Sequence, residues 1–94
     1  MNKNIQTLQK VLEKQPVLME DMVAMFIECS ELSNRKITEP EKVPSLIQML
    51  SQSGNVNNLI NYCINAYVNA KKATACYVYD KNSKLITVFV DERS

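Results

Sequence analysis

The residues of this chain best suited to nucleophilic chemistry are three cysteines, and their spacing argues against that use. Cys29, Cys63 and Cys76 lie far apart, and no pair has the spacing of a redox or zinc-binding motif. Each falls on the apolar side of a periodic segment, where cysteine usually serves as a small core residue. An odd number of cysteines without a disulfide pattern favours a reducing compartment, so we expect a cytoplasmic protein.

The other groups that catalysis needs are scarce. The chain has no histidine, which removes the commonest general base and metal ligand. Its single glycine, Gly54, cannot form a glycine-rich phosphate-binding loop. Glu28 with Glu31, and Asp80 with Asp91, have no spacing that indicates a pocket or a calcium loop. We therefore expect that the protein is not an enzyme and has no catalytic residue, metal site or cofactor.

Length and charge limit the partners. We expect one small globular domain over residues 1–94. The 11 basic and 10 acidic residues give a net charge of +1, which argues against strong generic attraction to nucleic acid or to an anionic membrane. No apolar run approaches the roughly 20 residues of a membrane span, and the first residues lack a signal-peptide pattern. We therefore expect no membrane partner.

The stretch Val17–Leu32 gives the clearest helical signal. Its apolar residues recur at helical spacing and cover more than half of the circumference, so it should be a central buried helix. A narrow acidic edge remains, made of Glu20, Asp21, Glu28 and Glu31. This edge is either a solvated face or a docking strip for a basic partner, with Glu20, Glu28 and Glu31 as the contact residues.

Two shorter helices should pack around this central one. Asn4–Gln15 is amphipathic and should end at Pro16, because proline pushes the residue before it out of the helical region. Thr38 can cap a single turn over Thr38–Lys42. A short helix, Pro44–Gln52, should follow that turn and present its apolar residues to the core.

A fourth helix is expected over Val56–Lys72, and its polar face is unusual. Four asparagines fall in one stripe along it: Asn58, Asn61, Asn65 and Asn69. Asparagine is a mediocre helix former, and lysine or glutamate would suit a purely solvated surface better. The stripe is either a solvent face in an asparagine-rich chain or a surface of paired donors and acceptors that contacts a partner.

The C-terminal residues have the pattern of a β-hairpin. Ala75–Tyr79 and Leu85–Val90 are rich in β-branched and aromatic residues and flank a short polar loop. If Tyr79 lies opposite Leu85, one fully apolar face should pack on the helices: Cys76, Val78, Ile86 and Val88. The other face carries Tyr77, Tyr79, Leu85, Thr87 and Phe89. This face is too apolar to be left in water, so it should bind a partner or lie under the first helix.

Together these segments predict an α+β fold, in which a four-helix cluster is followed by a C-terminal antiparallel β-hairpin. The expected core draws on every helix and on both strands. Its residues are Leu8, Leu12, Leu18, Met22, Met25, Phe26, Cys29, Leu46, Leu50, Ile60, Cys63, Tyr67, Val78, Ile86 and Val88.

The order of short helix, turn, longer helix and hairpin is similar to that of a winged helix–turn–helix. The similarity implies that Val56–Lys72 is a recognition helix whose asparagines, Asn58, Asn61, Asn65 and Asn69, read base edges. It also implies that basic residues meet phosphates: Lys72, Lys81 and Lys84. The recognition helix has no arginine, and its lysines come only at its end, so DNA binding is the second hypothesis.

The first hypothesis is a small regulatory or protein-interaction module of the adaptor, inhibitor, immunity-protein or antitoxin kind. It follows from the lack of catalytic groups, the near-zero net charge and the second apolar face of the hairpin. The partner would be another protein or a second copy of the chain, which would make a homodimer. The expected contact residues are Tyr77, Tyr79, Phe89, Glu20, Glu28 and Glu31.

Overall fold

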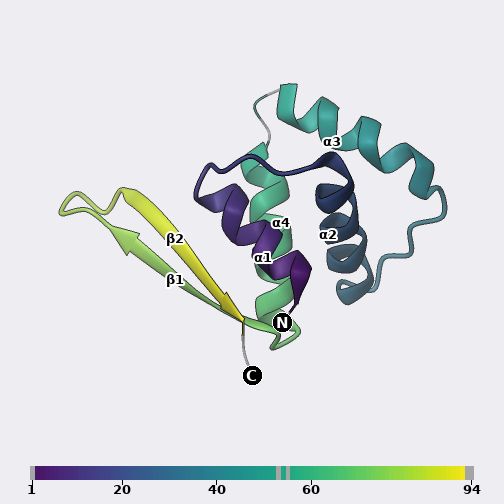
Figure 1. The fold of residues 1–94 in the computed structure, drawn as a ribbon. Helices are drawn as coiled ribbons and strands as arrows, with labels where there is room; N and C mark the ends of the chain where they lie inside the picture. The colour runs from purple at the N-terminus through teal and green to yellow at the C-terminus, as the bar shows by residue number, and fades with distance from the viewer. Residues whose placement is uncertain (1, 53, 55, 93–94) are drawn as a thin grey trace.

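The computed structural model describes residues 2–52, 54 and 56–92, and for residues 78, 86–89, 91 and 92 it describes the backbone alone. The elements are α1 (Lys3–Leu12), α2 (Met19–Leu32), the 3₁₀ turn η1 (Pro40–Lys42), α3 (Val43–Gln52), α4 (Val56–Asn69), β1 (Ala73–Tyr79) and β2 (Leu85–Glu92). Within these residues, four helices form a cluster, as predicted, and the two strands extend away from it (Figure 1).

The helices pack as a cluster in which α4 touches each of the other three. α2 contacts α1, α3 and α4, and β1 continues from α4 and packs back on it. β2 packs on α1 rather than on α4. Among the described residues, the cluster therefore meets the strands mainly through α1 and α4.

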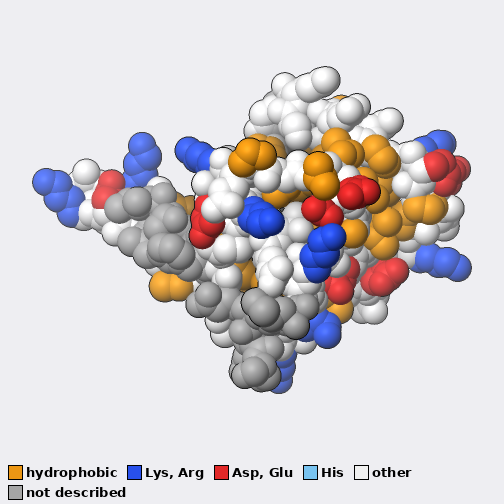
Figure 2. Space-filling view, viewed as in Figure 1, with side chains coloured by type: hydrophobic (Ala, Val, Ile, Leu, Met, Phe, Trp, Pro, Cys, Tyr) orange, Lys and Arg blue, Asp and Glu red, His pale blue; other side chains and the backbone are white. Residues whose placement is uncertain are grey.

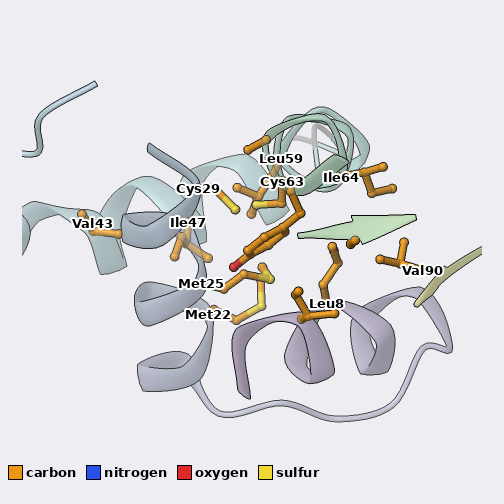
Figure 3. Packing of buried hydrophobic residues seen from close by; sticks show 14 residues of the cluster. Leu8, Met22, Met25, Cys29, Val43, Ile47, Leu59, Cys63, Ile64 and Val90 are labelled. Atoms are coloured by element: carbon orange, nitrogen blue, oxygen red, sulfur yellow. The ribbon is translucent and has the colours of Figure 1, made fainter. Parts of the chain in front are cut away.

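The core lies where α1, α2 and α4 meet (Figure 3). Six predicted core residues are buried: Leu8, Met22, Met25, Cys29, Cys63 and Tyr67. Leu12, Phe26, Leu46, Leu50 and Ile60 are only partly buried. The side chains of Val78, Ile86 and Val88 lie outside the described residues. The prediction for Leu18 is wrong: its side chain is 62% exposed, because it occupies the extended N-cap position that precedes α2.

The helix α1 ends earlier than the sequence predicts. Its last residue is Leu12 instead of Gln15, so Pro16 is not what stops it. Lys14 adopts a left-handed conformation with φ of 59°. The N–H of Gln15 then donates to the carbonyl of Lys10 at 2.8 Å, which closes a Schellman turn. A backbone motif that needs no glycine thus ends the helix.

The other long helices end in the same way. After α2, Asn34 has a φ of 60°, and after α4, Lys71 has a φ of 59°. The N–H of Lys72 donates to the carbonyl of Tyr67 at 2.9 Å. The predicted end of α4 at Lys72 is therefore wrong by three residues, and the helix ends at Asn69. Lys72 lies in the link to β1 instead of on the helix.

The start of the third helical region also differs from the prediction. Glu39 occupies the N-cap of η1, and no side chain caps that turn, so the expected capping role of Thr38 is not found. The turn runs directly into α3 at Val43, with Pro44 in the first turn, where a missing N–H costs no hydrogen bond.

The register of the two strands decides which side chains face the helices. β1 and β2 pair antiparallel with Tyr79 opposite Leu85, as the sequence suggests. The pairing then skips Ile86, so Val78 lies opposite Thr87. A bulge of one residue moves every later β2 side chain to the other face of the ladder.

The bulge places even-numbered residues of β2 beside odd-numbered residues of β1, and the face of β1 that packs on the helices is the one opposite to the prediction. Ala73 and Val90 are buried on the helices, and Ala75 packs partly against the same core. Cys76 is exposed, so its predicted position on the packed face is wrong. The base of the strands is also held by a side chain, because the N–H of Val90 donates to Gln9 Oε1 at 3.1 Å.

Candidate functional site

The strands move away from the helix cluster as they run towards their turn (Figure 1). Strand alternation places Tyr77 on the same face as the packed Ala73, and the register adds Tyr79 and Leu85 to that face. Buried at the base, this face becomes exposed at the far end, where Tyr77 is 43%, Tyr79 57% and Leu85 48% exposed. The predicted contact residue Phe89 has a side chain outside the described residues.

A hollow of about 530 Å³ separates the start of β2 from the helices. We call it the hairpin cleft. Val11 and Leu12 of α1 and Ile60 of α4 form its apolar wall, and Leu85 closes it from the strand side. Lys14 and Asn61 supply its polar edge. The exposed end of the apolar strand face therefore adjoins a hollow that continues the same apolar surface.

The turn between the strands is organised by one carboxylate. Asp80 Oδ1 accepts the N–H groups of Asn82 at 2.8 Å and of Lys84 at 2.9 Å. Ser83 has a φ of 63°, which completes the reversal. Lys81 and Lys84 are exposed there, and Figure 2 shows basic side chains at this far end of the molecule. The turn thus carries positive charge beside the exposed tyrosines.

The predicted acidic strip is not continuous. Glu20 and Glu31 are exposed on α2. Glu28 is half-buried, and its Oε1 accepts a hydrogen bond from Asn2 Nδ2 at 3.1 Å. Asp21 forms an ion pair with a lysine of α1 at 3.2 Å. Two of the four carboxylates therefore help to attach α1 to α2, which leaves Glu20 and Glu31 as separate charges.

The asparagine stripe is exposed along α4 and forms what we call the asparagine row: Asn58, Asn61, Asn65 and Asn69. Asn61 lines the hairpin cleft on one side, whereas Asn58 borders a second hollow on the other. Lys72 lies at the base of the strands, and Lys81 and Lys84 lie at their far end. The three lysines that the winged-helix similarity groups together are therefore at opposite ends of the strand pair.

The second hollow, which we call the Arg35 groove, was not foreseen from the sequence. Its volume is about 450 Å³, and it lies between α2, α3, α4 and the segment after α2. The rings of Phe26 and Tyr62 form its aromatic part, with centroids 5.9 Å apart. The Arg35 guanidinium carbon lies 5.6 Å from the Tyr62 ring centroid. The available sequence signal was Tyr62, which borders the asparagine stripe.

The buried thiols and phenol are poor candidates for reactive groups. Figure 3 shows the sulfur atoms of Cys29 and Cys63 beside each other in the core. The hydrogen bond with Cys29 and burial raise the pKa of Cys63. Burial raises the pKa of Tyr67 most, and the neighbouring Glu28 carboxylate raises it further. The Tyr67 hydroxyl forms no hydrogen bond of good geometry with the described residues. Cys63 and Tyr67 therefore stay protonated near neutral pH and supply neither a nucleophile nor a base.

Comparison of the chain with protein-family models, with curated proteins and with solved structures found no match. Among the described residues, no group of three or more cysteine or carboxylate side chains could hold a metal ion. No helix in the same part of the chain is long and apolar enough to cross a membrane. The candidate surfaces are therefore the hairpin cleft, the asparagine row and the Arg35 groove.

Proposed function

We propose that this protein is a small non-enzymatic regulatory module of the cytoplasm that acts by protein association, and that it binds a second copy of itself. The observation that supports this most is the exposed apolar end of the strand pair, formed by Tyr77, Tyr79 and Leu85. An isolated two-stranded sheet is marginal in water, and its open edges can pair with another chain. Association would cover both the side chains and an edge.

The residue types suit an interface. Tyrosine is enriched in protein interfaces because its ring buries a large apolar area while its hydroxyl stays near water. Tyr79 lies opposite Leu85, which lines the hairpin cleft, and this cleft can receive a side chain from the partner. Anchors of this kind, inserted into a pocket, provide most of the binding free energy in many complexes.

Charge supports the choice of a second copy as the partner. The turn of the strand pair places Lys81 and Lys84 beside its apolar surface. At the start of α2, Leu18 is 62% and Met19 37% exposed, and the exposed Glu20 follows directly. One copy thus offers an apolar surface with a basic edge, and the other offers an apolar surface with an acidic edge. A two-fold axis would form this contact twice and close the dimer.

The test is the double variant Tyr77→Ser/Tyr79→Ser, examined by sedimentation velocity. We expect the wild type to be dimeric and the variant to be monomeric, and the variant should remain folded because both side chains are exposed. Met49→Ser is the matched control, because Met49 is 59% exposed on α3 and should leave the dimer intact. A wild-type chain that stays monomeric up to about 1 mM would rule out this function.

A second candidate function is DNA binding, and the exposed asparagine row favours it. Asparagine side chains can pair with adenine edges, and α3, α4 and the strands follow the order of a winged helix–turn–helix. If this function holds, replacing Asn58, Asn61 and Asn65 by alanine removes sequence preference. Replacing Lys81 and Lys84 by glutamine weakens binding to all sequences and lowers the salt slope by about 2. Absence of duplex binding at low salt would exclude it.

A further inference from the structure

We infer that the Arg35 groove binds a small amphipathic carboxylate, with its apolar body between α2, α3 and α4 and its carboxylate at Arg35 and Lys36. This inference does not depend on association through the strands, because the groove lies on the other side of the asparagine row. It rests on the shape of the groove, on its apolar walls and on two cations that lack acidic partners.

The walls of the groove are largely apolar. They come from segments far apart in the sequence: Phe26 from α2, Ile37 from the following loop, Leu46 from α3 and Leu59 from α4. The volume of about 450 Å³ lies within the range of small-molecule sites, roughly 300–1,000 Å³. An adjoining hollow of about 410 Å³ shares Phe26, Ile37 and Leu46, so the surface continues along the loop. An elongated apolar body fits such a shape.

The end of α2 fixes the cation at the mouth of the groove. Asn34, with a φ of 60°, turns the chain, and the Arg35 N–H donates to the Ser30 carbonyl at 2.8 Å. This Schellman turn holds the Arg35 backbone, and the guanidinium then lies 5.6 Å from the Tyr62 ring centroid. A cation over an aromatic face is attracted by the ring quadrupole. The donor is therefore oriented before any ligand arrives.

The two cations at the mouth form no ion pair with the described residues, although Glu31 lines a neighbouring hollow together with them. None of the described carboxylates forms an ion pair with Arg35 or Lys36, and none lines the groove. Elsewhere in the described residues, Lys42 pairs with Glu39 at 2.8 Å. A planar carboxylate matches the two parallel donors of a guanidinium, and the neighbouring ammonium adds a second attraction.

The floor of the groove explains why the ligand body should be apolar. The Tyr62 hydroxyl donates to Ser30 Oγ at 3.3 Å, so the polar atoms there already satisfy one another. Only the Asn58 amide remains as a neutral polar group at the edge. A sugar or a nucleotide base would lose its hydrogen bonds to water and find few in return, which disfavours both.

Titration of the full chain with decanoate below its micellar concentration tests the inference, with decanol and acetate as probes that each lack one half of the ligand. We expect decanoate to bind, decanol to bind about tenfold more weakly and acetate not to bind. Amide chemical shifts should change at Arg35, Ile37 and Tyr62. No binding of decanoate, or equal binding of decanol, would overturn the inference.

Variants separate the two halves of the site. Arg35→Gln should weaken decanoate about tenfold and leave decanol unchanged, because it removes charge and keeps the backbone turn. Ile37→Asn, in the loop, should weaken both probes. Lys81→Gln is the matched control, since it removes an exposed cation outside the groove and should change neither affinity. An equal loss in Lys81→Gln and Arg35→Gln would mean nonspecific attraction and contradict the inference.

Discussion

The hairpin cleft and the Arg35 groove lie on either side of α4. Each combines an apolar surface with basic residues at its edge. They differ in how these parts are held. Leu59 in the groove is 3% exposed, whereas Leu85 in the cleft is 48% exposed. The walls of the groove belong to the helix core, but one wall of the cleft is a strand that has left it. A site whose walls belong to the core suits a small molecule, and a site with one wall outside the core suits a second chain.

The cations beside the two hollows also differ in how firmly they are held. Arg35 is held by a backbone turn and by the ring of Tyr62. Lys81 and Lys84 extend from a surface turn on flexible stems. Arginine in a fixed position selects the geometry of an anion, whereas lysines of this kind mainly accelerate and orient an encounter. The difference indicates recognition of shape in the groove and of charge at the cleft.

The reactivity of the three thiols should show the largest difference between the helix core and the strands. Cys29 and Cys63 are 0% exposed in the core, whereas Cys76 is exposed on the strands. In the native state, we expect one thiol to react rapidly with an aromatic disulfide reagent and two to react at least about a thousandfold more slowly, because these need the core to open. The rapid phase should vanish in Cys76→Ser. Two rapid thiols would mean that the helix core is as accessible to the reagent as the surface of the strands.

Truncation of one leucine in each wall gives the next largest difference. Leu59→Ala should lower the free energy of unfolding by about 2–4 kcal/mol, because it leaves a cavity in the core. Leu85→Ala should cost less than about 0.5 kcal/mol in the monomer, since its side chain is half in water. Urea unfolding of both variants at low protein concentration measures this. Equal losses would contradict the view that the strand wall stands apart from the core.

Alkaline pH should weaken the core behind the groove. The pKa values of Cys63 and Tyr67 are raised in the folded state above their ordinary values of 9.0 and 10.0. The unfolded chain therefore loses these protons first as pH rises. Stability is fully present below about pH 8 and should fall above pH 9 by about 1.4 kcal/mol per pH unit for each ionising group.

Unfolding midpoints between pH 7 and 11 check this expectation. Tyr67→Phe should remove the part of the loss that begins near pH 10, because it removes the buried hydroxyl that ionises there. The matched Tyr79→Phe, on the exposed end of the strands, should leave this loss unchanged. A flat profile in the wild type would show that these groups are more hydrated than their burial indicates.

The sequence was sufficient for the helices because apolar periodicity reports directly on burial. The spacing of Met22, Met25 and Cys29 identified the buried face of α2. It was insufficient for the strands, since one unpaired residue, Ile86, changes which residues of β1 and β2 share a face and leaves no mark in an apolar alternation. The exposure of Cys76 follows from that single residue.

The Arg35 groove could not have been predicted, for a different reason. Its residues come from four segments, and their meeting depends on how α2, α3 and α4 pack. Nothing local marks Arg35 as a residue that lies over Tyr62. The helix ends were equally hidden, because lysines such as Lys14 and Lys71 occupy positions where the expected signal is glycine.

The smallest expected effect concerns the left-handed residues that end the helices. It tests whether the helix end beside the strands and the helix end beside the Arg35 groove are equally relaxed. A non-glycine residue in the left-handed region costs about 1 kcal/mol, and asparagine tolerates it better than lysine. Lys71→Gly, at the base of the strands, should therefore raise stability by about 0.5–1 kcal/mol. Asn34→Gly, at the mouth of the groove, should raise it less. A larger gain at Asn34 would mean that the turn holding Arg35 is strained, and that the groove is less preorganised than its geometry indicates.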